Sequence, residues 1–284
     1  MCMPERGIHS AHEARAHEAR QWCSVVPIIF LEFLAMAMPS GVLPIMISDH
    51  YGARAYLLTS MGQAVRGLLA FLASPAIGAL SDLLGRKHLF VICITGSSAP
   101  YAILGLGASL DTHIAALGLS GALSATFPLA FAYIADVVPT HARAAAFGST
   151  IGLGMGGAFL LGPLAGTMIE HHFGDRALFR VCLWITVLNA AFALAVLREK
   201  AHPPPAHTGM LLRRANPFAS FALLRRNRAL RLLCGIVLLY YFALWGFVAN
   251  KGIYARRRFG QTSRQTAEQL TVFGLSAALS QSVG

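Results

Sequence analysis

Long apolar segments recur along this chain, and they restrict its fold more than any other feature. A bilayer-spanning α-helix needs about 20 mainly apolar residues, and seven stretches reach that length, followed by a weaker eighth. Their predicted bounds are Val25–Ile47, Ala55–Leu80, His88–Leu110, His113–Ala135, Ala144–Ile169, Ala177–Leu197, Leu232–Ala249 and, for the eighth, Ala267–Gly284. The sequence therefore predicts an all-α, polytopic membrane protein.

The composition supports this fold class. Charged residues make up 12% of the 284, whereas soluble domains average about 25%. The net charge of +11 would suggest nucleic acid in a soluble chain, but the basic residues form short clusters between the apolar runs. Nucleic-acid binding needs a solvated basic face. We therefore expect a lipid bilayer as the surroundings and no nucleic-acid partner.

The sequence offers no catalytic, metal or cofactor site. The five cysteines include no CxxC pair and the histidines no HExxH pattern, which excludes a disulfide framework and leaves a metal site without support. No GxxxxGK[ST] motif occurs, so ATP-driven pumping has no support either. We expect no cofactor, no metal and no enzymatic activity.

The positions of Lys and Arg predict a cytoplasmic N-terminus, because cytoplasmic loops are enriched in these residues. The outer loops between the first six segments would hold only Arg54, Arg176 and Arg180. The inner segments would hold Arg6, Arg15, Arg20, Arg86, Lys87, Arg143, Arg198, Lys200, Arg213, Arg214, Arg225, Arg226, Arg228 and Arg231. One outer loop disagrees, since it would hold Lys251, Arg256, Arg257, Arg258 and Arg264. The choice between plasma membrane and endomembrane stays open.

The spacing of the apolar segments predicts two bundles. We expect a cytoplasmic tail over 1–24, a six-helix bundle over 25–197, a basic cytoplasmic linker over 198–231 and the start of a second bundle over 232–284. Within the linker, the segment Phe218–Arg226 has an amphipathic pattern. It is typical of a helix on the inner leaflet surface or of a calmodulin-type target.

The connection after the second segment reads Gly78-Ala-Leu-Ser-Asp82-Leu-Leu-Gly85-Arg86-Lys87. A tight turn between two spanning helices needs glycine where the backbone reverses. Asp82 lies four positions before Arg86, so these two side chains can pair and fix the loop.

This connection resembles the signature G-x-L-[SA]-D-x-x-G-R-[KR] of the major facilitator superfamily. Gly78, Asp82, Gly85, Arg86 and Lys87 all fit that signature. In the family, this loop latches two helical bundles and helps control alternating access. The resemblance implies the same gating role here.

The connection after the fourth segment reads Ala135-Asp136-Val-Val-Pro139-Thr-His-Ala-Arg143. It resembles the family's A-D-x-x-P-x-x-x-R element. An acid and a base again flank a hairpin, and the spacing of Asp136 and Arg143 suits a cytoplasmic charge clamp.

The fifth segment is rich in glycine and includes Gly162-Pro163 and Gly166. One interpretation is close helix packing on a bare face, with a kink at the proline. The other is the family's antiporter motif G-x-x-x-G-P-x-x-G-G. Here Ala158 and Thr167 replace its first and last glycines, so the partial fit favours export or antiport without establishing it.

Further matches resemble the hippocampus-abundant-transcript-like branch, which is related to bacterial tetracycline/proton antiporters. The matching stretches include Ile29–Phe33, Gln63–Leu69, Ser120-Gly121, Thr126-Phe127, Phe131–Asp136 and Pro217–Ser220. The resemblance covers the chain from Val25 onward. Because the family has twelve helices, we expect that this sequence is a fragment or a truncated version that stops about four helices short.

Two charged residues lie deep within spans, where a charge costs about 2.5–3.5 kcal/mol on insertion scales. Glu32 is roughly 6 Å from the midpoint of its segment and Arg66 within roughly 3 Å of the midpoint of its own. Gln63 lies one turn from Arg66 and shares its face. One interpretation is a structural ion pair between Glu32 and Arg66. The other is a carboxylate that binds protons or substrate, because burial and a nearby guanidinium act on its charge in opposite directions.

The tetracycline antiporters carry an acid at a similar offset before their M-P-x-L-P element, which supports Glu32 as a site residue. Many antiporters of the superfamily also carry an arginine early in the fourth helix, and His113–Leu123 contains none. Proton coupling is therefore a hypothesis.

The sequence as a whole predicts a secondary active transporter that moves a small organic solute by alternating access, with antiport or efflux favoured. The site lies near the midplane between bundles. The alternative is a transport-incompetent, truncated membrane scaffold or regulatory protein. The solute, the coupling ion and the oligomeric state cannot be read from the sequence.

Overall fold

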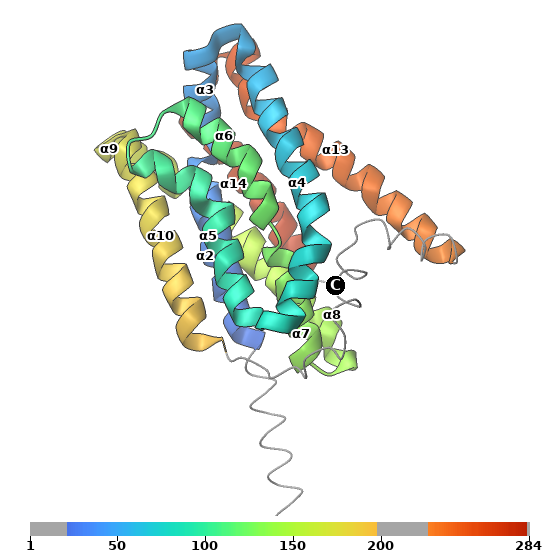
Figure 1. Cartoon of the computed structure of the whole chain (residues 1–284). Coiled ribbons are helices and arrows are strands. Elements are labelled where there is room, and N and C mark those ends of the chain that lie inside the picture. Colours follow the sequence, from blue (N-terminus) through green and yellow to red (C-terminus); the bar gives the residue numbers. More distant parts are fainter. Residues whose placement is uncertain (1–21, 198–226, 283–284) are drawn as a thin grey trace, which may run out of the picture.

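The computed structural model describes residues 22–197 and 227–282 (Figure 1). The predicted amphipathic segment Phe218–Arg226 and nearly all of the predicted tail and linker lie outside the described residues. Within the described part, all regular structure is helical. The predicted all-α membrane fold is therefore confirmed.

The elements follow one another with short connections. The α-helices are α2 (Val25–Ala37), α3 (Leu43–Tyr51), α4 (Ala55–Leu84), α5 (Arg86–Gly105), α6 (Leu110–Ser120), α7 (Thr126–Val137), α8 (Arg143–Ser149), α9 (Gly157–Phe173), α10 (Asp175–Val196), α13 (Arg228–Phe259) and α14 (Ser263–Ser282). Short 3-10 turns are η1 (Trp22–Ser24), η2 (Met38–Ser40), η3 (Gly52–Arg54), η4 (Gly121–Leu123) and η5 (Thr140–Ala142), and η6 (Thr150–Gly156) is a π-helix.

Six helical stretches of the described chain are long and apolar enough to cross a membrane. They are Val25–Asp82, Arg86–Gly105, Leu110–Val137, Thr140–Phe173, Asp175–Val196 and Arg228–Phe259. The first has 58 residues and reverses direction between α3 and α4 (Figure 1), so it contains the first two predicted spans. Helix α14 is not among the six, in keeping with its weaker apolar pattern.

Three predicted spans contain irregular turns, and local sequence explains them. The first span breaks at η2, where Pro39 supplies no backbone N–H to the helix. The fourth breaks after η4, at Ser124 and Ala125. The fifth contains the π-helix η6, in a stretch with three glycines. Such π-helical turns often mark functional sites.

The bundle has two ends, which we name by residues. The Arg86 face holds the starts of α2, α5 and α8 and the ends of α4, α7 and α10. The Arg256 face holds the ends of α3, α5, α9 and α13 and the starts of α4, α6, α10 and α14. Figure 1 shows these two ends at the bottom and the top of the view.

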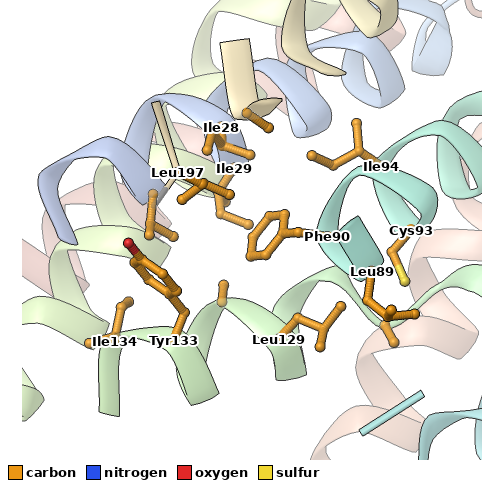
Figure 2. Packing of buried hydrophobic residues seen from close by; sticks show 14 of the residues in the cluster. Ile28, Ile29, Leu89, Phe90, Cys93, Ile94, Leu129, Tyr133, Ile134 and Leu197 are labelled. Atoms are coloured by element: carbon orange, nitrogen blue, oxygen red, sulfur yellow. The ribbon is translucent and has the colours of Figure 1, made fainter. Parts of the chain in front are cut away.

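The core of the first bundle lies between α2, α5 and α7, with Leu197 from the end of α10. Phe90, Ile28, Ile29, Ile94 and Ile134 are fully buried there, and Figure 2 shows their side chains converging. Within this packed cluster the three helices hold fixed positions, so polar side chains on them are held in register with one another.

Helix α14 packs along α9, which makes it part of the folded body. A Cβ added at Gly274 would lie 2.6 Å from the carbonyl carbon of Phe159, so only glycine allows this close approach. Helix α13 leans away from the bundle over most of its length (Figure 1).

Helix α13 is longer than the predicted span Leu232–Ala249. Asn227 caps its start by accepting a hydrogen bond from the Leu230 amide at 3.2 Å, and Gly260 ends it in the left-handed conformation with φ of 62°. Residues Lys251 and Arg256–Arg258 were predicted to lie in an outer loop. The loop assignment was wrong, because these residues form the last turns of the helix; their side of the membrane stays a prediction.

Candidate functional site

Glu32 lies in α2 with 3% of its surface exposed. Its Oε1 accepts a 2.6 Å hydrogen bond from the Ser97 hydroxyl of α5 and a 2.8 Å hydrogen bond from the Thr126 hydroxyl of α7. Its Oε2 is buried and has no hydrogen-bond partner in the described chain. The carboxyl group is therefore oriented through one oxygen alone.

The break between α6 and α7 explains how Thr126 reaches Glu32. Thr126 is the first residue of α7, directly after the irregular residues Ser124 and Ala125. A Cβ at Gly121 would overlap the backbone carbonyl of Arg66, so η4 touches α4 without an intervening side chain. This contact fixes where the chain restarts as α7.

Arg66 does not pair with Glu32, so the predicted structural ion pair is not formed. Arg66 instead donates a 3.3 Å hydrogen bond to the Ser124 hydroxyl, which in turn donates to the Ser120 carbonyl at 2.9 Å. The hydroxyls of Ser97 and Thr126, from α5 and α7, are the hydrogen-bond donors to Glu32 in the place of Arg66. Gln63, one turn from Arg66, is half-buried.

Half-buried phenylalanines continue from this site toward the Arg86 face. Successive ring centroids in the order Phe159, Phe33, Phe127, Phe131 and Phe147 are 6.2, 5.2, 5.4 and 5.0 Å apart. They come from α9, α2, α7 and α8. The surroundings of Glu32 thus combine an apolar aromatic row with a few polar groups, as small-molecule sites commonly do.

On the Arg86 face, one arginine joins the two predicted loop motifs. The Nε of Arg86 lies 2.5 Å from Asp136 Oδ2, and a terminal nitrogen lies 3.1 Å from Asp82 Oδ1. A third contact links Arg86 to the Ser81 hydroxyl at 3.4 Å. The expected pairing of Asp82 with Arg86 is present, and Asp136 from the other motif is the second carboxylate bound to the same arginine.

The expected pairing of Asp136 with Arg143 is not formed. Arg143 donates its Nε–H to the Val138 carbonyl at 3.0 Å. The extended residue Val138 and the turn η5 separate the two side chains, while α5 brings Arg86 directly beside Asp136. The α4–α5 turn and the loop after α7 are therefore joined by one charge clamp centred on Arg86, whereas the sequence suggested a separate acid–base pair in each loop.

The turn between α4 and α5 depends on Gly85, whose φ is 91°. The other glycine of the motif, Gly78, is a helical residue of α4 and has open space where a side chain would be. Lys87 is half-buried in the first turn of α5.

The glycines of the fifth segment allow α9 to cross α2 closely. A Cβ at Gly162 would lie 2.7 Å from the Ala37 Cβ, and one at Gly166 would overlap the Met38 carbonyl. Pro163 is buried between them. This contact supports the packing interpretation of these residues and does not test the antiporter interpretation.

Helices that repeatedly cross the membrane, a buried carboxylate in the first of them and charge-clamped loops at one face define a polytopic α-helical membrane protein. The chain belongs to the Major Facilitator Superfamily, whose family profile matches residues 25–284. The fold and family predicted from the sequence are thereby confirmed.

Individual relatives are similar over most of this chain. The Hippocampus abundant transcript 1 protein of Mus musculus is 27% identical over 262 residues, which are 91% of this chain and 53% of the relative. The class C tetracycline resistance protein of Escherichia coli is 30% identical over 249 residues, 83% of this chain and 56% of the relative. The chain thus spans about half the length of these relatives.

A solved structure shows the same fold. The crystal structure of the human organic anion transporter MFSD10 (TETRAN) aligns with a TM-score of 0.71 at 21% identity. The alignment covers 93% of this chain and 71% of that one.

Some of the residues around Glu32 were not predicted from the sequence. Ser97 and Ser124 carry no signal of their own within apolar runs, and Thr126 stood out only through the family resemblance. The cluster Ser120-Gly121, followed closely by Ser124 and Thr126, was the available signal, because small and hydroxyl residues inside a span indicate a break or a polar contact.

Proposed function

We propose that the protein is a secondary active transporter that moves a small organic solute across the membrane by alternating access. The observation that carries this proposal is Glu32, a carboxylate inside the membrane with one oxygen held by two hydroxyls and the other unpartnered. Ionisable groups at this depth are costly and usually functional. Membership of the Major Facilitator Superfamily agrees with this reading.

We further propose that Glu32 couples transport to protons. A proton would bind at Oε2, while Ser97 and Thr126 keep the carboxyl group oriented through Oε1. Arg66 and Gln63 would lie at the edge of the same site, and a solute that approached them would change the surroundings of the carboxylate. Proton binding and solute binding would thereby exclude each other, as antiport requires.

The aromatic row supports an organic solute with a large apolar or aromatic surface. Five phenylalanine rings in edge or tilted contact form a continuous apolar surface beside the polar groups. Such rings bind flat apolar molecules through area burial and ring contacts.

The charge clamp of Asp82, Arg86 and Asp136 is proposed to gate the Arg86 face. It connects the α4–α5 turn to the end of α7, so these helix ends are expected to move as one unit. We propose that this face is cytoplasmic, because the basic residues of the first half of the chain favour that orientation.

Transport in proteoliposomes tests the proposal. The protein, purified from its own source, would be reconstituted with a pH gradient and supplied with a panel of radiolabelled apolar organic solutes. Gradient-driven movement of at least one solute, reduced by Glu32→Gln, supports the proposal. Absence of movement for every solute, in vesicles that hold correctly folded protein, contradicts it.

The alternative function, a transport-incompetent scaffold, is favoured only by the chain's length relative to its relatives. The intact mass of the native protein separates the two. A mass well above 30.3 kDa, by about four helices, supports a complete transporter. A mass equal to this chain's would require a second component for transport.

A further inference from the structure

The basic cluster on the Arg256 face contradicts the charge distribution of the remaining chain. Lys251, Arg256, Arg257, Arg258 and Arg264 lie at the end of α13 and the start of α14. If the Arg86 face is cytoplasmic, positive residues at the opposite end work against membrane insertion in the expected orientation. A specific structural role for some of these basic residues would explain why they lie at this end of the bundle.

Two of these arginines contact the first bundle through side chains. Arg256 faces Asp49 of α3 with two contacts, Nε to Oδ1 at 3.3 Å and a terminal nitrogen to Oδ2 at 3.1 Å. Arg257 lies over the ring of Tyr56, the second residue of α4, at 5.2 Å from the centroid. The two contacts join the end of α13 to α3 and α4, and Asp49 and Arg256 are 207 positions apart in the chain.

The geometry at the end of α13 prepares Arg256 for this pairing. Gly260 adopts the left-handed conformation, and its amide donates a 3.0 Å hydrogen bond to the Arg256 carbonyl. The Arg256 guanidinium also reaches the Gln261 carbonyl at 3.5 Å. Planar, two-point pairing of guanidinium with carboxylate is more specific than a single contact.

Beneath the charged pair lies a small apolar cluster that is separate from the main core. Ile253 of α13, 1% exposed, packs with Leu43 and Ile47 of α3, Ala55 of α4 and Phe179 of α10. A Cβ at Gly252 would lie 2.8 Å from Pro44. The last two turns of α13 are therefore seated on the first bundle.

The preceding turns of α13 do not pack on the first bundle in this way. Leu232, Ile236, Leu239, Phe242 and Trp245 each have between 54% and 80% of their surface exposed. Helix α13 is thus attached to the first bundle at the Arg256 face and free of it toward the other end.

We propose that Asp49 and Arg256, with Tyr56 and Arg257 beside them, form a latch that keeps the Arg256 face closed. The latch must open when that face exposes the solute site. Asp49 and Arg256 would be positioning residues that set the balance between the two access states. This inference rests on the proposed transport function for its purpose, but its test requires no solute.

The test measures access to a position under the latch. Ile47, 4% exposed, is replaced by cysteine in a variant whose native cysteines are serine, and a membrane-impermeant maleimide is added from the Arg256 face. Asp49→Asn and Arg256→Gln are each expected to speed labelling about 1.5- to fivefold, the range for a partly exposed ion pair. Tyr56→Leu is expected to add a smaller increase.

The exchange of the two charges, Asp49→Arg with Arg256→Asp, is expected to restore slow labelling. Raised ionic strength should speed labelling in the parent and have little effect in Asp49→Asn, because salt screens partly exposed pairs. Glu268→Gln is the matched control, since it breaks the Arg264–Glu268 pair at 3.0 Å on the same face but within α14 alone. It should leave the rate unchanged.

Three results would overturn the latch: parent-like labelling in both single variants, no rescue by the exchange, or an equal increase from Glu268→Gln. Rescue by the exchange also excludes simple misfolding of the single variants. Because labelling is independent of the solute, a functioning latch without transport would refute the proposed function while leaving the latch intact.

Discussion

The Thr126 hydroxyl donates a 2.8 Å hydrogen bond to Glu32, 94 positions earlier in the chain. It shares the acceptor oxygen with Ser97, so the two donors orient the carboxyl group and leave Oε2 without a partner in the described chain. This arrangement needs three helices in fixed register. It also provides the most direct test of proton coupling.

Replacement of Glu32 by Gln should abolish the pH dependence of transport. The amide oxygen can still accept from Ser97 and Thr126, so the fold is expected to survive, but the group can no longer exchange a proton. The measurement is solute flux in proteoliposomes over a series of pH values. Thr126→Val is the companion variant, which should displace the pH profile without removing it. A wild-type profile in Glu32→Gln would show that the carboxylate has no coupling role.

Loss of Asp136 should destabilise the protein more than loss of Arg143. Asp136→Asn removes the charge closest to Arg86, whose side chain is only 14% exposed, and hydrogen bonds to charged groups contribute about 1.5–3 kcal/mol. Arg143→Gln removes a bond to one backbone carbonyl and should cost about 1 kcal/mol. Thermal unfolding in detergent, followed by intrinsic fluorescence, compares the two. The reverse order would contradict the shared clamp.

The two glycines of the first motif should respond in opposite ways to alanine. Gly85→Ala forces a side chain into a backbone with φ of 91° and should cost about 1 kcal/mol or more. Gly78→Ala lies within α4 in open space and should be neutral or stabilise by up to about 1 kcal/mol, because alanine favours helix. The unfolding midpoints of both variants provide the check. Equal losses would mean that Gly78 meets a partner that this part of the chain does not include.

Gly166→Ala should weaken the packing of α9 on the turn η2 that follows α2. The added methyl group would collide with the Met38 carbonyl, and such overpacking costs about 1–3 kcal/mol. Gly157→Ala is the control on the same helix, since its Cβ would lie 3.5 Å from the Phe30 ring in ordinary contact. Unfolding midpoints and the monodispersity of the detergent-solubilised protein would be compared. Stability equal to that of Gly157→Ala would refute the close contact.

Much of the fold was accessible from the sequence. The spans Ala55–Leu80 and Ala177–Leu197 correspond to α4 and α10 within a few residues, because an unbroken apolar run inside a bilayer can only satisfy its backbone as a helix. The end of α13 was not predicted, since arginines usually mark the end of a span. Here the helix continues through Arg256–Arg258 until Gly260 ends it.

The candidate site was predicted only in part. Glu32 and Arg66 were recognisable because ionisable residues inside apolar runs are rare and costly. Their partners were not, because Ser97 and Ser124 are ordinary residues until helix packing brings them beside a charge. The assignment of Asp136 to Arg143 failed for the same reason, since nearness in sequence favoured Arg143 and packing favoured Arg86. The roles of these residues in gating and coupling stay predictions.

The sequence by itself determined that this protein is a helical membrane protein with a conspicuous acid in its first span and an acid–base turn after its second. Those features follow from hydropathy, local spacing and turn chemistry, which act over a few residues. Only the tertiary structure decided that Glu32 is bound by Ser97 and Thr126, that Arg86 unites two loops and that Arg256 meets Asp49. These contacts link residues 50 to 207 positions apart, and such pairs become neighbours only when helices pack.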